Sequence, residues 1–150
     1  MFYLDQCDGH LDNACGTIAV IHSLLNNRDI IGLSGSSAPI EEYYQRTKDK
    51  EYKERGIALD GDPKIAEIHN SMVSMGQSRP VSCDKICHHF VSLVEHDKHL
   101  VELDGAYNDG PHVVEEIEGD FLESAVEFIK NKYIDKIGSI QFSLMALVMK

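Results

Sequence analysis

The spacing of apolar residues along this chain predicts four helices. In four segments apolar side chains recur every three or four residues, or the segment opens on a proline suited to a first helical turn. These segments are residues 14–25, 39–56, 63–76 and 120–133. The first, which Asp12 or Asn13 can cap, is apolar on nearly every face, as in a helix buried at the centre of a domain. The second is charged, so we expect it to be exposed and to end by Gly56.

Three short apolar runs predict strands. Residues 90–94 and 99–103 flank Asp97 and Lys98, which suit a tight turn, so these two runs are expected to pair as an antiparallel hairpin. Residues 142–149 are predicted to close the chain as a buried strand. Helices combined with an antiparallel hairpin indicate an α+β domain.

Composition and charge limit the kind of protein. With 150 residues, 43% of them hydrophobic, the chain fits a single domain spanning residues 1–150. A formal net charge of −11 opposes binding to nucleic acid and to anionic membranes, and it favours a basic partner. No apolar stretch reaches the roughly 20 residues that span a bilayer, and the first residues do not form a secretory signal. We therefore expect a cytoplasmic protein, and a monomer.

The four cysteines are expected to be free thiols. Cys7, Cys15, Cys83 and Cys87 could form two disulfides, but a chain of this size needs no covalent staples. Cys15 stands in the sequence Asn-Ala-Cys-Gly-Thr at the predicted start of the first helix. Unpaired backbone amides and the helix dipole favour an anion there, and the thiolate is the reactive form of cysteine. The alternative for Cys15 is a small residue of the core.

A thiolate nucleophile needs a base, and His89 and Asp104 are of the types required. An imidazole can take the thiol proton and later protonate the leaving group. His89 lies at the start of the predicted hairpin and Asp104 at its end, so the two side chains could face each other. Each alone is commonly structural, a histidine before a strand and an aspartate in a turn. Together with Cys15 they give the order nucleophile, base and orienting carboxylate.

Two blocks of sequence resemble a known family. The segment NACGTIAVIHSLLNN resembles the nucleophile helix of ubiquitin carboxyl-terminal hydrolases, and HHFVSLVEHDKHLVELDG resembles their hairpin with the catalytic His and Asp. The separations between Cys15, His89 and Asp104 also agree with that family, and the resemblance covers nearly the whole chain. It implies a papain-related α+β fold, with a central antiparallel sheet surrounded by helices.

The function that the resemblance implies is that of a thiol-dependent deubiquitinase. Cys15 would be the nucleophile, His89 its base and Asp104 the residue that orients the base. The substrate would be a small or unfolded adduct on the final glycine of ubiquitin or of a ubiquitin-like protein, and no cofactor or metal is implied. Residues 76–87 match the family's crossover loop, which passes over the active site and restricts the leaving group.

Two departures from the family bear on activity. The family has an oxyanion-stabilising Gln six residues before the nucleophile, where this chain has Gly9, and Gln6 and His10 are the nearest alternative donors. The family also has an N-terminal portion that supplies a strand and part of the ubiquitin-binding surface. This chain begins almost at the nucleophile helix, as in a truncated product or a natural short form. The alternative function is therefore a catalytically impaired or inactive ubiquitin-binding fragment.

Two other interpretations compete with this one. Cys83, Cys87, His88 and His89 are of the types that bind zinc, but the spacing is unlike paired zinc knuckles. Neighbouring strand residues also point to opposite faces, which would separate His88 from His89. The second interpretation is a purely structural domain, in which both matching blocks of sequence would have arisen by chance. The remaining histidines have no partner pattern, and His22 on the first helix is expected to be a core residue.

Overall fold

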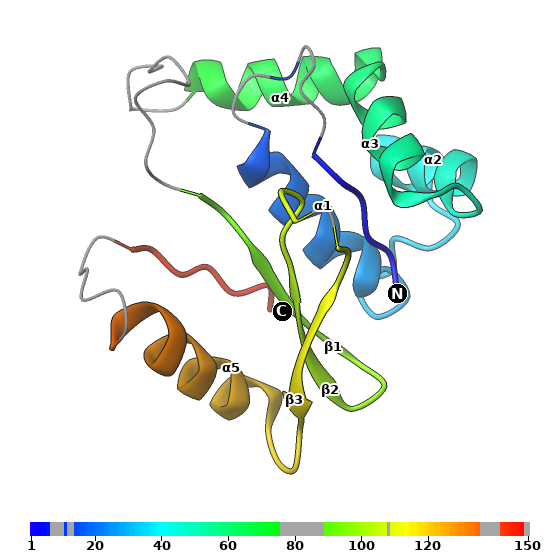
Figure 1. The fold of residues 1–150 in the computed structure, drawn as a ribbon. Coiled ribbons are helices and arrows are strands. Elements are labelled where there is room, and N and C mark those ends of the chain that lie inside the picture. The colour runs from blue at the N-terminus through cyan, green and yellow to red at the C-terminus, as the bar shows by residue number, and fades with distance from the viewer. Residues whose placement is uncertain (7–10, 12–13, 76–88, 108, 136–141, 149–150) are drawn as a thin grey trace.

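The computed structural model, shown in Figure 1, describes residues 1–6, 11, 14–75, 89–107, 109–135 and 142–148. It confirms an α+β architecture, with helices around an antiparallel sheet. The helices are α1 (Cys15–Asn26), α2 (Pro39–Thr47), α3 (Tyr52–Asp60), α4 (Pro63–Met75) and α5 (Phe121–Ile129), and a π-helical turn, η2 (Lys130–Ile134), follows α5. The strands are β1 (Ser92–His96), β2 (His99–Leu103) and β3 (His112–Glu116). No helix in the described ranges is long and apolar enough to cross a membrane.

Helix α1 lies between the sheet and the group formed by α2, α3 and α4 (Figure 1). On the sheet side, Ser23 Oγ and Ser92 Oγ are 2.8 Å apart. On the other side α1 contributes to a buried apolar cluster, whose members from α1 to α4 include Ile18, Ile21, Leu25, Tyr43, Leu59 and Ile65. Val20 is nevertheless 49% exposed. The prediction of a central helix is therefore right, but its burial on every face is wrong.

The predicted hairpin is confirmed. β1 pairs with β2 in antiparallel register, and the two residues that join them, Asp97 and Lys98, have φ of 49° and 62°. Two consecutive positive φ values match the twist of a two-residue hairpin turn. β3, which the sequence pattern did not predict, adds to the free edge of β2, so the strand order is β1-β2-β3.

The face of the sheet opposite α1 carries α5 (Figure 1). Because neighbouring strand residues alternate between faces, Leu103 lies on the α1 side with its partner Ser92, and Glu102 lies on the other. Glu102 is 1% exposed and is contacted by Lys132 and Tyr133 of η2. Helix α5 begins where the Asp120 carboxylate accepts backbone N–H groups of the first turn, as an N-cap residue does.

The predicted helix over residues 39–56 is wrong in its extent, because the chain forms two helices there. The Arg55 guanidinium donates to the carbonyls of Thr47 and Lys48, satisfying the C-terminal end of α2. Glu51 and Glu54 form a capping box that starts α3, so Gly56 lies inside a helix.

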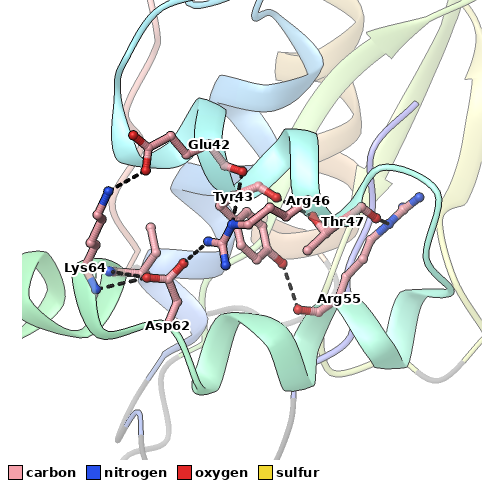
Figure 2. Close-up of polar contacts among 8 residues, drawn as sticks. Glu42, Tyr43, Arg46, Thr47, Arg55, Asp62 and Lys64 are labelled. Atoms are coloured by element: carbon pink, nitrogen blue, oxygen red, sulfur yellow. Dashed lines mark hydrogen bonds and ion pairs between the residues drawn. The ribbon is translucent and has the colours of Figure 1, made fainter.

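Ion pairs hold these short helices together, as Figure 2 shows. Arg46 on α2 pairs with Asp62, and Glu42 on α2 pairs with Lys64, so that α2 is joined to the start of α4. The Asp62 carboxylate also accepts the N–H of Lys64 at 2.9 Å and thereby helps to start α4. The helix predicted over residues 63–76 is confirmed as α4.

The predicted terminal strand is wrong for residues 142–148. That segment joins no strand ladder and its side chains are exposed, including Met145 at 83% and Val148 at 75%. These residues have the apolar composition of a strand, but a strand also needs a partner with which to exchange backbone hydrogen bonds. On α5 as well, Leu122 and Val126 of the predicted apolar face are more than half exposed, and Ala125 is the buried one.

Candidate active site

Cys15 is the first residue of α1. The helix has no acidic residue in its first turn, and its earliest intrahelical bond, from the N–H of Ile18 to the carbonyl of Ala14, leaves the Cys15 N–H without a partner inside the helix. Cys15 is half-buried and is a free thiol. A thiolate at this position would lie at the positive end of the helix dipole with no nearby carboxylate in that turn to oppose it.

His89 and Asp104 are in direct contact. His89 Nε2 is 2.6 Å from Asp104 Oδ1, a short distance typical of a charge-assisted hydrogen bond. The Asp104 side chain is 10% exposed and that of His89 is 40% exposed, so the carboxylate is shielded while the ring reaches solvent. Because Nε2 faces Asp104, Nδ1 is the nitrogen left to meet a nucleophile. The sequence prediction that these two side chains face each other is correct.

The turn after β2 fixes the Asp104 carboxylate. Asp104 Oδ1 also accepts the backbone N–H of Ala106 at 2.9 Å, and the Asp104 carbonyl accepts the N–H of Tyr107 at 3.1 Å. Two donors therefore meet at one carboxylate oxygen, and both define its orientation.

The first turn of α1 lies beside the start of the hairpin. A Cβ atom placed on Gly16 would lie 3.6 Å from Cδ2 of Phe90, which is ordinary van der Waals contact. Gly16 follows Cys15 and Phe90 follows His89, so the contact joins the neighbours of the proposed nucleophile and base. Ile18 of α1 also meets the turn after β2, because a Cβ on Gly105 would lie only 2.9 Å from Ile18 Cγ2.

The N-terminal segment ties the same elements together. Its extended residues run past α1, where the N–H of Leu4 donates to Nε2 of His22 at 3.2 Å. Next, the N–H of Gln6 donates to the carbonyl of Gly105 at 2.6 Å, one residue from Asp104. The Gln6 side chain is exposed. Gly9 and His10, the other positions considered for the oxyanion donor, lie outside the described residues.

His22 is a core residue, as predicted from its place on the first helix. It is fully buried, and because Nε2 accepts a hydrogen bond the ring must be neutral. Burial lowers the pKa of His22 to about 4 and outweighs the smaller opposing effects of its neighbours. Nδ1 of His22 is buried and has no hydrogen-bond partner among the described residues.

The described residues do not test the zinc interpretation. Cys83, Cys87 and His88 lie outside the described residues, as does the proposed crossover loop. Within the described ranges, no group of three or more potential metal ligands lies together.

Sequence reasoning missed Tyr3 and Gly105, which lie against Asp104. The Asp-Gly pair was a signal for the turn, whereas a lone aromatic residue near the chain start gives none.

Comparisons with known proteins show what the chain is similar to. Residues 1–134 match the family model described as ubiquitin carboxyl-terminal hydrolase, family 1. The chain is 29% identical over 147 residues to a ubiquitin carboxyl-terminal hydrolase of Drosophila melanogaster, covering 98% of this chain and 62% of that protein. It is 34% identical over 146 residues to a probable ubiquitin carboxyl-terminal hydrolase of Dictyostelium discoideum, covering 94% and 55%. The chain thus spans less than two thirds of the length of either relative.

A similar solved structure is the UCH37 catalytic domain of Trichinella spiralis, bound to ubiquitin vinyl methyl ester. The TM-score is 0.67 with 26% sequence identity, over 95% of this chain and 60% of that one. The fold is therefore that of this type of catalytic domain, in agreement with the resemblance noted in the sequence.

Proposed function

Because the chain belongs to the ubiquitin carboxyl-terminal hydrolase family, we propose that it is a thiol-dependent deubiquitinase that removes small or unfolded adducts from the C-terminal glycine of ubiquitin. Cys15 is the nucleophile, His89 its base and Asp104 the orienting carboxylate. The observation that carries the proposal is the 2.6 Å contact between His89 Nε2 and Asp104 Oδ1, on a hairpin whose start lies against the first turn of α1.

The residues support an acyl-transfer reaction. His89 Nδ1 takes the proton of Cys15, and the sulfur attacks the carbonyl carbon of the ubiquitin C-terminus. As the tetrahedral intermediate collapses, the imidazolium gives its proton to the leaving amine and a thioester remains. Water, deprotonated by the same ring, then releases ubiquitin and restores the thiol. Asp104 keeps the ring in the tautomer and orientation that both steps need.

The developing oxyanion needs donors, and two are available. The N–H of Cys15, the first residue of α1, has no acceptor inside the helix, so it is left to donate to the substrate oxygen. Gln6 is the second candidate, because its backbone is bonded to Gly105 beside Asp104 and its side chain is exposed. This location supports Gln6 as the side-chain donor that counting back from Cys15 would assign to Gly9.

A second candidate function is ubiquitin binding with impaired or absent catalysis. It is favoured by exposed apolar residues such as Met72 and Leu144. Ubiquitin as the partner is supported in both cases by the similar structure, which holds ubiquitin vinyl methyl ester. A monomeric state and a cytoplasmic location stay predictions.

The test is reaction with a ubiquitin that carries a C-terminal electrophile. We expect one covalent adduct by intact mass, mapped to Cys15 by peptide sequencing, and no adduct with the Cys15→Ala variant. Hydrolysis of a fluorogenic ubiquitin amide then separates the two candidates, because the binding fragment forms a complex without turnover. A folded protein that neither binds ubiquitin nor reacts with the probe would contradict both candidates.

A further inference from the structure

Tyr3 reaches from the N-terminal segment into the turn that carries Asp104. Its hydroxyl oxygen is 2.6 Å from the carbonyl of Asp104 and 2.7 Å from the carbonyl of Tyr107, so its single hydrogen is shared between the two ends of that turn. The side chain is 1% exposed. A phenol buried against two backbone carbonyls supplies a donor that water cannot readily replace.

The Tyr3 hydroxyl remains a donor at all ordinary pH values. Burial and the nearby carboxylates of Asp5 and Asp104 raise the pKa of Tyr3 well above its usual range. The ring is held from two sides: it stacks on His22 at a centroid distance of 5.2 Å and meets Tyr52 edge-on at 5.0 Å. The hydroxyl therefore projects from a ring with little freedom to move.

These contacts connect the base's partner to the nucleophile helix. His22 belongs to α1, which begins at Cys15, and Tyr3 bridges from the His22 ring to the carbonyl of Asp104. We propose that Tyr3 is a positioning residue for Asp104: it sets where the carboxylate sits relative to α1, and so how His89 is presented to Cys15. This inference rests on the proposed function of the Cys15, His89 and Asp104 site.

The physical reason is that the Asp104 side chain has no freedom to compensate. Its Oδ1 is already bonded to His89 and to the N–H of Ala106, so a shift of the turn backbone moves the carboxylate with it. Displacing a catalytic group by about 1 Å can lower a rate by around a hundredfold.

The test compares two tyrosines that each lose one oxygen. Tyr3→Phe keeps the ring and its stacking but removes the hydroxyl. Tyr43→Phe is the matched control, because Tyr43 is also fully buried and its hydroxyl donates to a backbone carbonyl, that of Arg55 at 2.8 Å, in the helical group drawn in Figure 2. Both variants should lower the melting temperature by a similar amount, so stability alone does not separate them.

Kinetics provide the first readout. For hydrolysis of a ubiquitin amide, we expect Tyr3→Phe to lower kcat by about ten- to a hundredfold with KM nearly unchanged, and Tyr43→Phe to leave both within about twofold. In an Asp104→Asn background, Tyr3→Phe should have little additional effect, because the group it positions is already disabled. An equal loss in both backgrounds would show that Tyr3 does not act through Asp104.

The second readout needs no turnover. Ring ¹⁵N resonances of His89, assigned with a His89→Gln variant, report the hydrogen bond to Asp104. We expect them to shift in Tyr3→Phe and to stay in place in Tyr43→Phe. Unchanged His89 resonances in folded Tyr3→Phe would overturn the proposal, even if the protein is an active hydrolase. A protein without hydrolase activity would instead count against the proposed function, while the resonances still decide the role of Tyr3.

Discussion

Among single residues, Asp104 is held more firmly than a turn requires. Its carboxylate oxygen meets two donors, His89 Nε2 and the N–H of Ala106, and its carbonyl meets two more, from Tyr107 and Tyr3. A solvent-exposed turn needs none of the side-chain contacts. This concentration of hydrogen bonds on an aspartate beside a histidine is what an orienting carboxylate demands.

The proposed roles of Cys15 as nucleophile and Asp104 as orienting residue predict different losses of activity. Cys15→Ala should abolish hydrolysis, because no other atom can form the thioester. Asp104→Asn should lower kcat by roughly 10²- to 10⁴-fold and leave a residual rate, since it mainly disturbs the orientation and tautomer of His89. Steady-state hydrolysis of a ubiquitin amide measures both, with circular dichroism to confirm folding. Equal turnover by wild type and Cys15→Ala would remove the assignment.

The proposed role of Gln6 as oxyanion donor predicts different effects on amide hydrolysis and on labelling by an electrophile. Gln6→Ala should lower kcat for a ubiquitin amide by about 10²- to 10³-fold, as loss of an oxyanion donor does, yet leave labelling by an electrophilic ubiquitin nearly intact. The control is Gln45→Ala, which removes a glutamine on α2 whose contact is with Glu41. If the Gln6 and Gln45 variants turn over the amide equally well, the donor is elsewhere.

At the scale of elements, prediction from sequence succeeded where the signal is local. The hairpin follows from Asp97 and Lys98 between two apolar runs, and α4 follows from apolar spacing within one segment. It failed where contacts between separate elements decide. The break between α2 and α3 depends on Arg55 reaching back to Thr47, and β3 depends on the edge of β2.

Within the candidate site, the contact between His89 and Asp104 was predictable for the same reason. His89 and Asp104 are brought together by one hairpin, so their contact follows from local pairing. The position of α1 beside that hairpin depends on packing across the sheet, as between Ser23 and Ser92. No sequence pattern shows such a contact, which is why the relation of Cys15 to the other two needed the family resemblance.

Packing between α1 and the turn after β2 gives a prediction at this scale. In Gly105→Ala the new methyl would lie 2.9 Å from Ile18 Cγ2 and 3.4 Å from backbone atoms of Leu4 and Gln6. A β-branched side chain is stiff at χ1, so Ile18 cannot easily turn away. We expect a loss of about 1–3 kcal/mol in the free energy of unfolding, measured with urea, together with reduced kcat.

Gly119→Ala is the matched control, because a Cβ there meets nothing within 4 Å. It should leave the unfolding midpoint almost unchanged. A Gly105→Ala protein as stable as the control would mean that α1 and the turn are not in tight contact.

At the scale of the whole molecule, three parts of the chain that are distant in sequence meet at His22. The N-terminal segment donates to its Nε2 through the N–H of Leu4, the backbone of Leu103 on β2 acts on the ring, and the ring itself belongs to α1. The proposed oxyanion donor, orienting carboxylate and nucleophile lie on these same three parts. The neutral His22 ring therefore joins the three parts of the chain that carry the proposed site residues, so the fold and the site both depend on it.

This arrangement predicts how stability depends on pH. Burial lowers the pKa of His22 from 6.5 to about 4, so between these values the unfolded chain binds a proton at this site that the folded chain does not. The free energy of unfolding must then fall as the pH falls through this window, by at most about 3 kcal/mol from His22, with no further contribution below it. Urea unfolding of wild type and His22→Gln at pH 7, 6, 5 and 4 tests this prediction.

Glutamine can accept the Leu4 N–H but does not titrate, so the wild type should lose more stability than the variant as the pH falls. Equal losses in the two proteins would show that His22 takes up its proton without unfolding the chain, and that the neutral ring does not hold the three segments together.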